Sequence, residues 1–86
     1  MKNVLYNSCP DEELFGRYID GEDAAFDAIV ERHGSFVLNY LWRYLGDREA
    51  AEDLTQEVFI KVVKASGSFK KGSKFRTWLF SIMINC

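Results

Sequence analysis

The sequence predicts an all-α fold, a compact bundle of about four helices in a single domain. Eighty-six residues suffice for only one small domain. Hydrophobic residues make up 48% of the chain and aromatic residues 15%, which is enough apolar material for a core. One proline and six glycines are too few for a small all-β domain, which needs a turn signal every ~8 to 12 residues. Apolar residues recur instead at intervals of three and four, as in amphipathic helices.

The first predicted helix starts at Pro10-Asp11 and runs to about Tyr18 or Ile19. Pro10 precedes it and three acidic residues open it, an order that suits the exposed N–H groups and the dipole of a helix N-terminus. Asp20-Gly21 ends the segment. Its apolar positions share one face: Leu14, Phe15, Tyr18 and Ile19.

The second predicted helix runs from Glu22 to Leu45. Its apolar stripe is interrupted around His33-Gly34-Ser35, where we expect a kink or a local thinning of the helix. We expect His33 to be a partly buried packing residue and not a ligand. Gly46 is placed to end the helix in the left-handed conformation, and Asp47 to cap the next one.

The third predicted helix extends from Arg48 to Ala65. Its inner face is expected to hold Ala51, Leu54, Val58, the stem of Lys61, Val62 and Ala65, with Phe59 and Val63 at the margin. Its outer face is expected to hold Glu52, Asp53, Gln56, Glu57 and Lys64.

Residues 66–73 form a predicted loop, because two glycines and three serines favour irregular backbone. Ser73 is expected to cap a fourth helix that starts near Lys74. The apolar face of that helix contains Phe75, Trp78, Leu79, Ile82 and Met83. The apolar pattern is still running at Cys86, so we expect the natural protein to continue and this chain to be a fragment.

Charge is divided unevenly along the chain. Residues 1–65 carry seven basic and all thirteen acidic residues, whereas residues 66–86 carry four basic and no acidic ones. Such asymmetry indicates a basic contact surface beside an acidic one, although a solvated basic face is the simpler alternative.

Catalytic and metal-binding functions find no support. The single histidine accompanies no nucleophile motif, and the glycines form neither a dinucleotide fingerprint nor a P-loop. Cys9 and Cys86 lie at opposite ends and make neither a disulfide framework nor a metal site. No apolar run approaches the ~18 residues of a membrane span. We therefore expect a soluble cytoplasmic protein that is not an enzyme, needs no cofactor and does not contact a membrane.

Two groups of residues remain as candidate sites. Glu52, Asp53, Gln56 and Glu57 share one surface strip at helical spacing and suit a protein partner bearing Arg or Lys; the alternative is an ordinary acidic face. Residues 68–80 interleave basic and aromatic side chains, as single-stranded nucleic acid requires. Within them Phe75 and Trp78 fit the core, whereas Phe69 lies isolated in the loop and is expected to add little to stability.

An ordered series of motifs in this chain resembles region 2 of the bacterial sigma-70 family, in its extracytoplasmic-function (group 4) branch. The series consists of Ala51-Glu52-Asp53-Leu54-Thr55-Gln56-Glu57-Val58-Phe59-Ile60-Lys61-Val62-Val63, Ser68-Phe69, Gly72, Phe75-Arg76-Thr77-Trp78-Leu79-Phe80, Ile82 and Asn85. Upstream, Asp11-Glu12-Glu13-Leu14, Gly21-Glu22-Asp23-Ala24-Ala25-Phe26 and Leu45-Gly46-Asp47 also match the spacing of that branch. The resemblance covers nearly all of residues 1–86, as one region 2 domain.

The resemblance implies that the chain binds core RNA polymerase and recognises and melts the promoter −10 element. Asp53, Gln56 and Glu57, with Glu52 nearby, fall where the family contacts the clamp coiled coil of the polymerase β′ subunit. The family's specificity loop, which holds an extruded non-template base, corresponds here to Phe69, Lys70, Lys71, Gly72 and Ser73. Asn85 corresponds to a position that reads an adjacent base, and Lys74 and Arg76 are candidates for phosphate contact. An anti-sigma factor is a further candidate partner.

Two rival functions remain open. One is a helical protein-interaction module that touches no DNA. The other is a repressor-type helix-turn-helix protein, which needs a basic recognition helix after a short turn. The only helix rich in surface charge, residues 48–65, is acidic, which disfavours the second rival.

Overall fold

The computed structural model of the chain describes residue 6, residues 8–70 and residues 72–85. Four α-helices follow one another: α1 (Asp11–Ile19), α2 (Asp23–Leu45), α3 (Arg48–Lys64) and α4 (Phe75–Ile84). A short 3-10 turn, η2 (Ser66–Ser68), follows α3. No strand occurs in the part of the chain that the structure describes. The all-α prediction is confirmed, and the helix bounds agree with the predicted ones within one residue.

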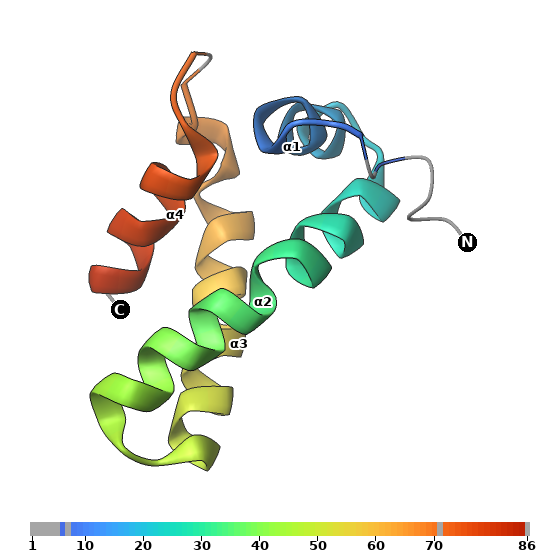
Figure 1. Cartoon of the computed structure of the whole chain (residues 1–86). Helices are drawn as coiled ribbons and strands as arrows, with labels where there is room; N and C mark the ends of the chain where they lie inside the picture. Colours follow the sequence, from blue (N-terminus) through green and yellow to red (C-terminus); the bar gives the residue numbers. More distant parts are fainter. Residues whose placement is uncertain (1–5, 7, 71, 86) are drawn as a thin grey trace.

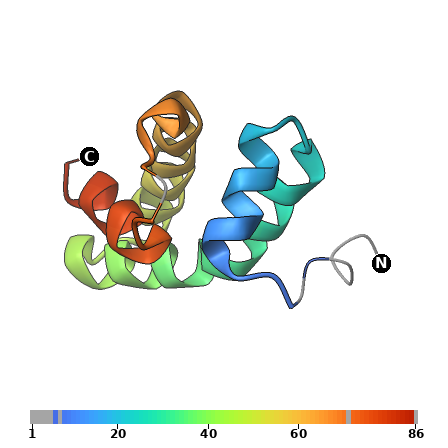
Figure 2. The same cartoon turned by 90° about the horizontal axis from the view of Figure 1, so that it is seen from above.

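Helix α2 is the longest and packs against both α1 and α3. Helices α2 and α3 make an antiparallel hairpin, and α1 packs on the first half of α2. Helix α4 returns beside α3, so that α1 and α4 approach each other at one end of the hairpin (Figures 1 and 2). None of the described helices is both long enough and apolar enough to cross a bilayer.

The α2–α3 hairpin is closed by the two predicted cap residues. Gly46 has a φ of 75°, in the left-handed region, and its N–H donates to Trp42 O at 2.8 Å. The Asp47 carboxylate accepts from the backbone N–H groups of Glu49 and Ala50 at 3.0 and 3.4 Å. Both cap predictions are confirmed, because glycine tolerates this φ and a carboxylate satisfies orphan N–H groups.

Helix α2 continues through His33-Gly34-Ser35, where the interrupted apolar stripe predicted a kink or a local thinning. His33 is only 2% exposed and takes an inward position among the apolar residues. The buried face of α2 is therefore continuous: the position that looked polar in the sequence is filled by the ring of a packing histidine.

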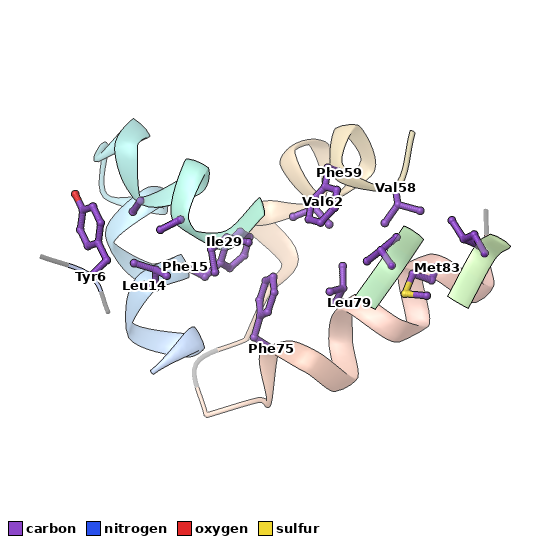
Figure 3. Close-up of a cluster of buried hydrophobic side chains, with 14 of the residues drawn as sticks. Tyr6, Leu14, Phe15, Ile29, Val58, Phe59, Val62, Phe75, Leu79 and Met83 are labelled. Atoms are coloured by element: carbon purple, nitrogen blue, oxygen red, sulfur yellow. The ribbon is translucent and has the colours of Figure 1, made fainter. Parts of the chain in front are cut away.

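One apolar core runs through all four helices (Figure 3). The largest fully buried side chains are Phe15, Phe75, Leu14, Ile29, Leu79, Val37, Val58 and Val62. On α3 the predicted inner face is largely correct, with two corrections. Phe59 is 7% exposed and belongs to the core, not its margin, whereas Lys61 is exposed along with Val63.

The start of α4 differs from its prediction. Lys74, not Ser73, occupies the N-cap position, and no side chain there caps the helix. Instead the Glu12 carboxylate on α1 accepts from the Phe75 N–H at 2.7 Å. A residue 63 positions away thus satisfies the exposed N–H group, and a negative charge there also complements the helix dipole.

Candidate functional site

The acidic strip of α3, defined by Glu52, Asp53, Gln56 and Glu57, is exposed as predicted. Glu52 is engaged by Arg48, whose Nε lies 3.1 Å from its carboxylate. No ion pair between described residues involves Asp53 or Glu57. The carboxylates of Asp53 and Glu57 are therefore available to a cationic partner.

A groove between α2 and α3 lies beside this strip, and sequence reasoning missed it. A hollow of about 460 Å³ adjoins a second one of about 380 Å³, and both are lined by Val30, Gly34, Thr55 and Gln56. The first hollow also contains Glu31, Ser35, Leu38 and Glu52, and the second Phe26, Phe59, Ile60 and Val63. We call this the α2–α3 groove; it has one polar and one apolar end.

A sequence signal for the groove was present. In the sequence, Ile60 and Val63 are apolar residues that fall outside the inner-face spacing of α3. In the structure, their side chains are 47% and 39% exposed. Gly34 contributes room, because nothing lies within 4 Å of the position that a Cβ would take. Exposed apolar residues beside a charged strip are typical of a protein-contact surface.

The predicted specificity loop follows η2 and is exposed at most described positions. Lys70, Gly72 and Lys74 are exposed and Ser73 is half-buried. Gly72 has a φ of 93°, which only glycine adopts without strain. Lys71 lies outside the described residues.

A cavity of about 450 Å³ separates the loop from α1. Its walls are formed by Glu12, Glu13, Gly16, Arg17, Ile19 and Asp20 on the α1 side and by Phe69 and Gly72 on the loop side. The loop thus faces a preformed hollow whose opposite wall is supplied by α1. Sequence reasoning did not assign α1 any part in this site.

Phe69 packs against the core more closely than its place in a loop indicated. Its ring lies edge-on to those of Trp78, Phe15 and Phe75, at centroid distances of 5.1, 5.3 and 6.0 Å. The side chain is half-buried, so one part contacts the core while another lines the cavity. The expectation that Phe69 adds little to stability does not fit these contacts; the packing of Phe75 and Trp78 agrees with expectation.

Phe69→Ala is expected to lower the free energy of unfolding by about 2 kcal/mol. Loss of a fully buried phenylalanine costs about 3 to 5 kcal/mol, and this ring is only partly buried. Urea denaturation of the variant and of Phe69→Leu, which keeps most of the apolar volume, measures the difference. A loss below about 0.5 kcal/mol for Phe69→Ala would show that the aromatic contacts do not anchor the loop.

The exposed face of α4 continues the loop surface. Lys74, Thr77, Trp78 and Ser81 line a hollow of about 380 Å³ together with Ser73. Asn85 follows at helical spacing, and its Nδ2 donates to Ser81 O at 2.9 Å. Asn85 is exposed, so its amide is accessible from solvent at the end of this face.

Arg76 lies on the neighbouring face of α4 and contacts α2. Its Nε donates to His33 Nδ1 at 3.3 Å, and its guanidinium carbon lies 3.8 Å from the centroid of the Phe36 ring. Because arginine can only donate, Nδ1 of His33 must be the acceptor, which leaves the imidazole proton on Nε2.

Asp11 completes this network from α1. Its Oδ1 lies 3.0 Å from His33 Nε2 and accepts from Arg32 Nη1, also at 3.0 Å. His33 Nε2 makes no well-aligned hydrogen bond among the described residues, so its contact with Asp11 is a close polar approach. Burial acts to raise the pKa of the Asp11 carboxyl, but the polar contacts with His33 and Arg32 outweigh it, and the pKa is lowered.

The model of the family Sigma-70 region 2 matches residues 29–86. The chain belongs to the sigma-70 family. Relatives place it in the extracytoplasmic-function branch. It is 39% identical over 75 residues to the RNA polymerase sigma-H factor of Pseudomonas aeruginosa, a match covering 87% of this chain and 39% of the relative.

Two further relatives agree. The ECF RNA polymerase sigma-E factor of Escherichia coli K12 is 36% identical over 75 residues, which are 87% of this sigma region 2 chain and 39% of that protein. The RNA polymerase sigma factor CarQ of Myxococcus xanthus is 35% identical over 69 residues, which are 80% of this chain and 40% of that protein. The chain spans about two-fifths of the length of these relatives.

Proposed function

We propose that this sigma region 2 domain binds core RNA polymerase through α3 and captures the unpaired −10 strand of a promoter through the loop and α4. It acts as a transcription initiation factor in the cytoplasm and does no chemistry of its own. The observation that supports the proposal is the separation of two unlike surfaces, an acidic one on α3 and a basic one on the loop and α4. The acidic strip occupies the middle of α3, and the basic loop follows the end of that helix, which lies about 10 Å beyond Glu57 at 1.5 Å per residue.

The polymerase contact is assigned to the acidic strip together with the α2–α3 groove. A helical partner can place apolar side chains in the end lined by Phe59, Ile60 and Val63 while its cations meet Asp53 and Glu57. The clamp coiled coil of the β′ subunit is the partner that the family resemblance implies. Charge complementarity of this kind sets orientation and association rate.

The DNA contact is assigned to residues 69–74, Arg76 and Asn85. Lys70, Lys71, Lys74 and Arg76 supply cations for phosphates, and the cavity between α1 and the loop offers room for an extruded base. Phe69 serves as a wall of that cavity and not as a free stacking platform. Asn85 is then placed to read an adjacent base. Binding only to unpaired strand shifts the duplex toward the open form.

Asp53→Ala and Gln56→Ala are each expected to weaken binding to bacterial core RNA polymerase by about tenfold, or about 1.4 kcal/mol. Their melting temperatures should stay close to that of the unmodified chain, because both side chains are exposed. Asp23→Ala, which removes an exposed acid from the first turn of α2, is the matched control. Unchanged polymerase affinity in both strip variants would contradict the assignment.

The DNA half is tested separately by charge reversal of Lys70 and Lys71. The paired variant should bind dye-labelled single-stranded DNA more weakly, with a salt dependence flatter by about 0.7 per lost phosphate contact. Equal binding by the variant and the unmodified chain would favour the alternative function, a helical interaction module that touches polymerase but no DNA. An anti-sigma factor that masks the acidic strip is a further partner compatible with the same surface.

A further inference from the structure

Among described residues, His33 is the one buried polar side chain, and the proposed function gives it no role. It lies on α2 where α1 and α4 both approach. Its ring contacts the Phe75 ring at a centroid distance of 5.2 Å, and its two nitrogens face different helices. Nε2 faces Asp11 on α1 and Nδ1 faces Arg76 on α4.

The Arg76 side chain is held on two sides. Nε is committed to His33, and one face of the guanidinium is stacked on Phe36. Arg76 is nevertheless an exposed residue, and no ion pair between described residues involves it. Its two terminal amino groups therefore remain as donors at the surface, with their charge not neutralised by a described carboxylate.

This arrangement suits a phosphate. A guanidinium binds a phosphate through paired N–H donors in a fixed plane, and a side chain that is already held loses less conformational freedom on binding. Lys74 occupies the N-cap position two residues before Arg76, so both cations lie at the end of α4 that follows the loop.

We propose that His33 is a positioning residue which, supported by Asp11, holds Arg76 in the orientation that receives a phosphodiester of single-stranded DNA. The proposal deepens the DNA-binding half of the proposed function and rests on it. His33 itself touches no DNA. It acts through the Nδ1 acceptor, while Nε2 links the ring to α1.

Two substitutions distinguish the role of His33 Nδ1 from that of His33 Nε2. His33→Asn keeps an acceptor at the position of Nδ1 and loses the donor toward Asp11. His33→Gln keeps a donor at the position of Nε2 and loses the acceptor for Arg76. Both remove the ring that packs on Phe75, so their loss of packing is shared and stability alone does not distinguish them.

The experiment measures binding of the full chain to a dye-labelled single-stranded DNA of randomised sequence at several salt concentrations, below the melting temperature of every variant. Arg76→Gln is expected to weaken binding roughly five- to tenfold and to flatten the salt dependence by about 0.7. His33→Gln should resemble Arg76→Gln, and His33→Asn should resemble the unmodified chain. Arg43→Gln, at the exposed far end of α2, removes an equal charge and should have little effect.

The NMR signal of the Arg76 Nε–H group gives a readout that needs no DNA. It should exchange slowly with solvent in the unmodified chain and in His33→Asn, and rapidly in His33→Gln. Equal DNA binding by His33→Gln and His33→Asn would overturn the proposal. This holds even if Arg76→Gln binds DNA weakly and the proposed function stands. Normal binding by Arg76→Gln would also overturn it. If the unmodified chain bound no single strand, the proposed DNA function would fail first and this role for His33 with it.

Discussion

Phe15→Ala is expected to remove about 3 to 5 kcal/mol of the free energy of unfolding. Phe15 is fully buried on α1, and its ring contacts those of Phe75, Phe69 and Trp78 at centroid distances of 4.9, 5.3 and 5.4 Å. It therefore joins α1 to both the loop and α4. A small domain has about 5 to 15 kcal/mol in total, so this loss is a large fraction of the stability of the fold.

Urea denaturation followed by circular dichroism measures this loss. Tyr44→Ala is the matched control, because it removes an aromatic ring that is 80% exposed and should change stability by less than about 0.5 kcal/mol. A cost below about 1 kcal/mol for Phe15→Ala would mean that α1 is not integral to the core.

Asp11→Ala is expected to cost about 2 to 3 kcal/mol. The substitution leaves buried His33 Nε2 without its carboxylate and also takes away the acceptor for Arg32. Glu13→Ala is the control: this acid lies on the same helix, but its pair with Arg17 is exposed and should contribute little. A loss for Asp11→Ala no greater than that for Glu13→Ala would contradict a structural role for the network.

The same carboxylate predicts a dependence of stability on pH. The pKa of Asp11 is lowered in the folded chain, so its contribution is complete above the ordinary carboxyl pKa of 3.8 and is lost as pH falls through the folded value. The unmodified chain should therefore lose more stability than Asp11→Ala when the pH is taken below that ordinary value. Parallel curves for the two proteins would contradict the lowered pKa.

Local signals in the sequence were enough for most of the fold. Helical spacing predicted the four helices, and the cap residues Gly46 and Asp47 act within a few residues of their own position. The acidic strip of α3 was predicted for the same reason, because residues on one face of a helix are fixed by their spacing alone.

What could not be predicted depends on contacts between distant segments. The cap of α4 is Glu12 and not the neighbouring Ser73, and no local pattern contains that information. His33 looked like a break in an apolar stripe because its partners Asp11 and Arg76 come from other helices. Phe69 looked isolated for the same reason, since its ring contacts lie on α1 and α4.

The hydrogen bond from the Phe75 amide to Glu12 bears on where the smallest stable version of this protein could begin. The family match starts at residue 29, yet α1 supplies both that carboxylate and the buried rings and chains of Leu14 and Phe15. A protein shortened to residue 29 would open the aromatic end of the core to water and free the helix that follows the loop. We expect such a shortened protein to lack fixed tertiary packing and to aggregate. The cooperative folding unit would then be larger than the segment that matches the family.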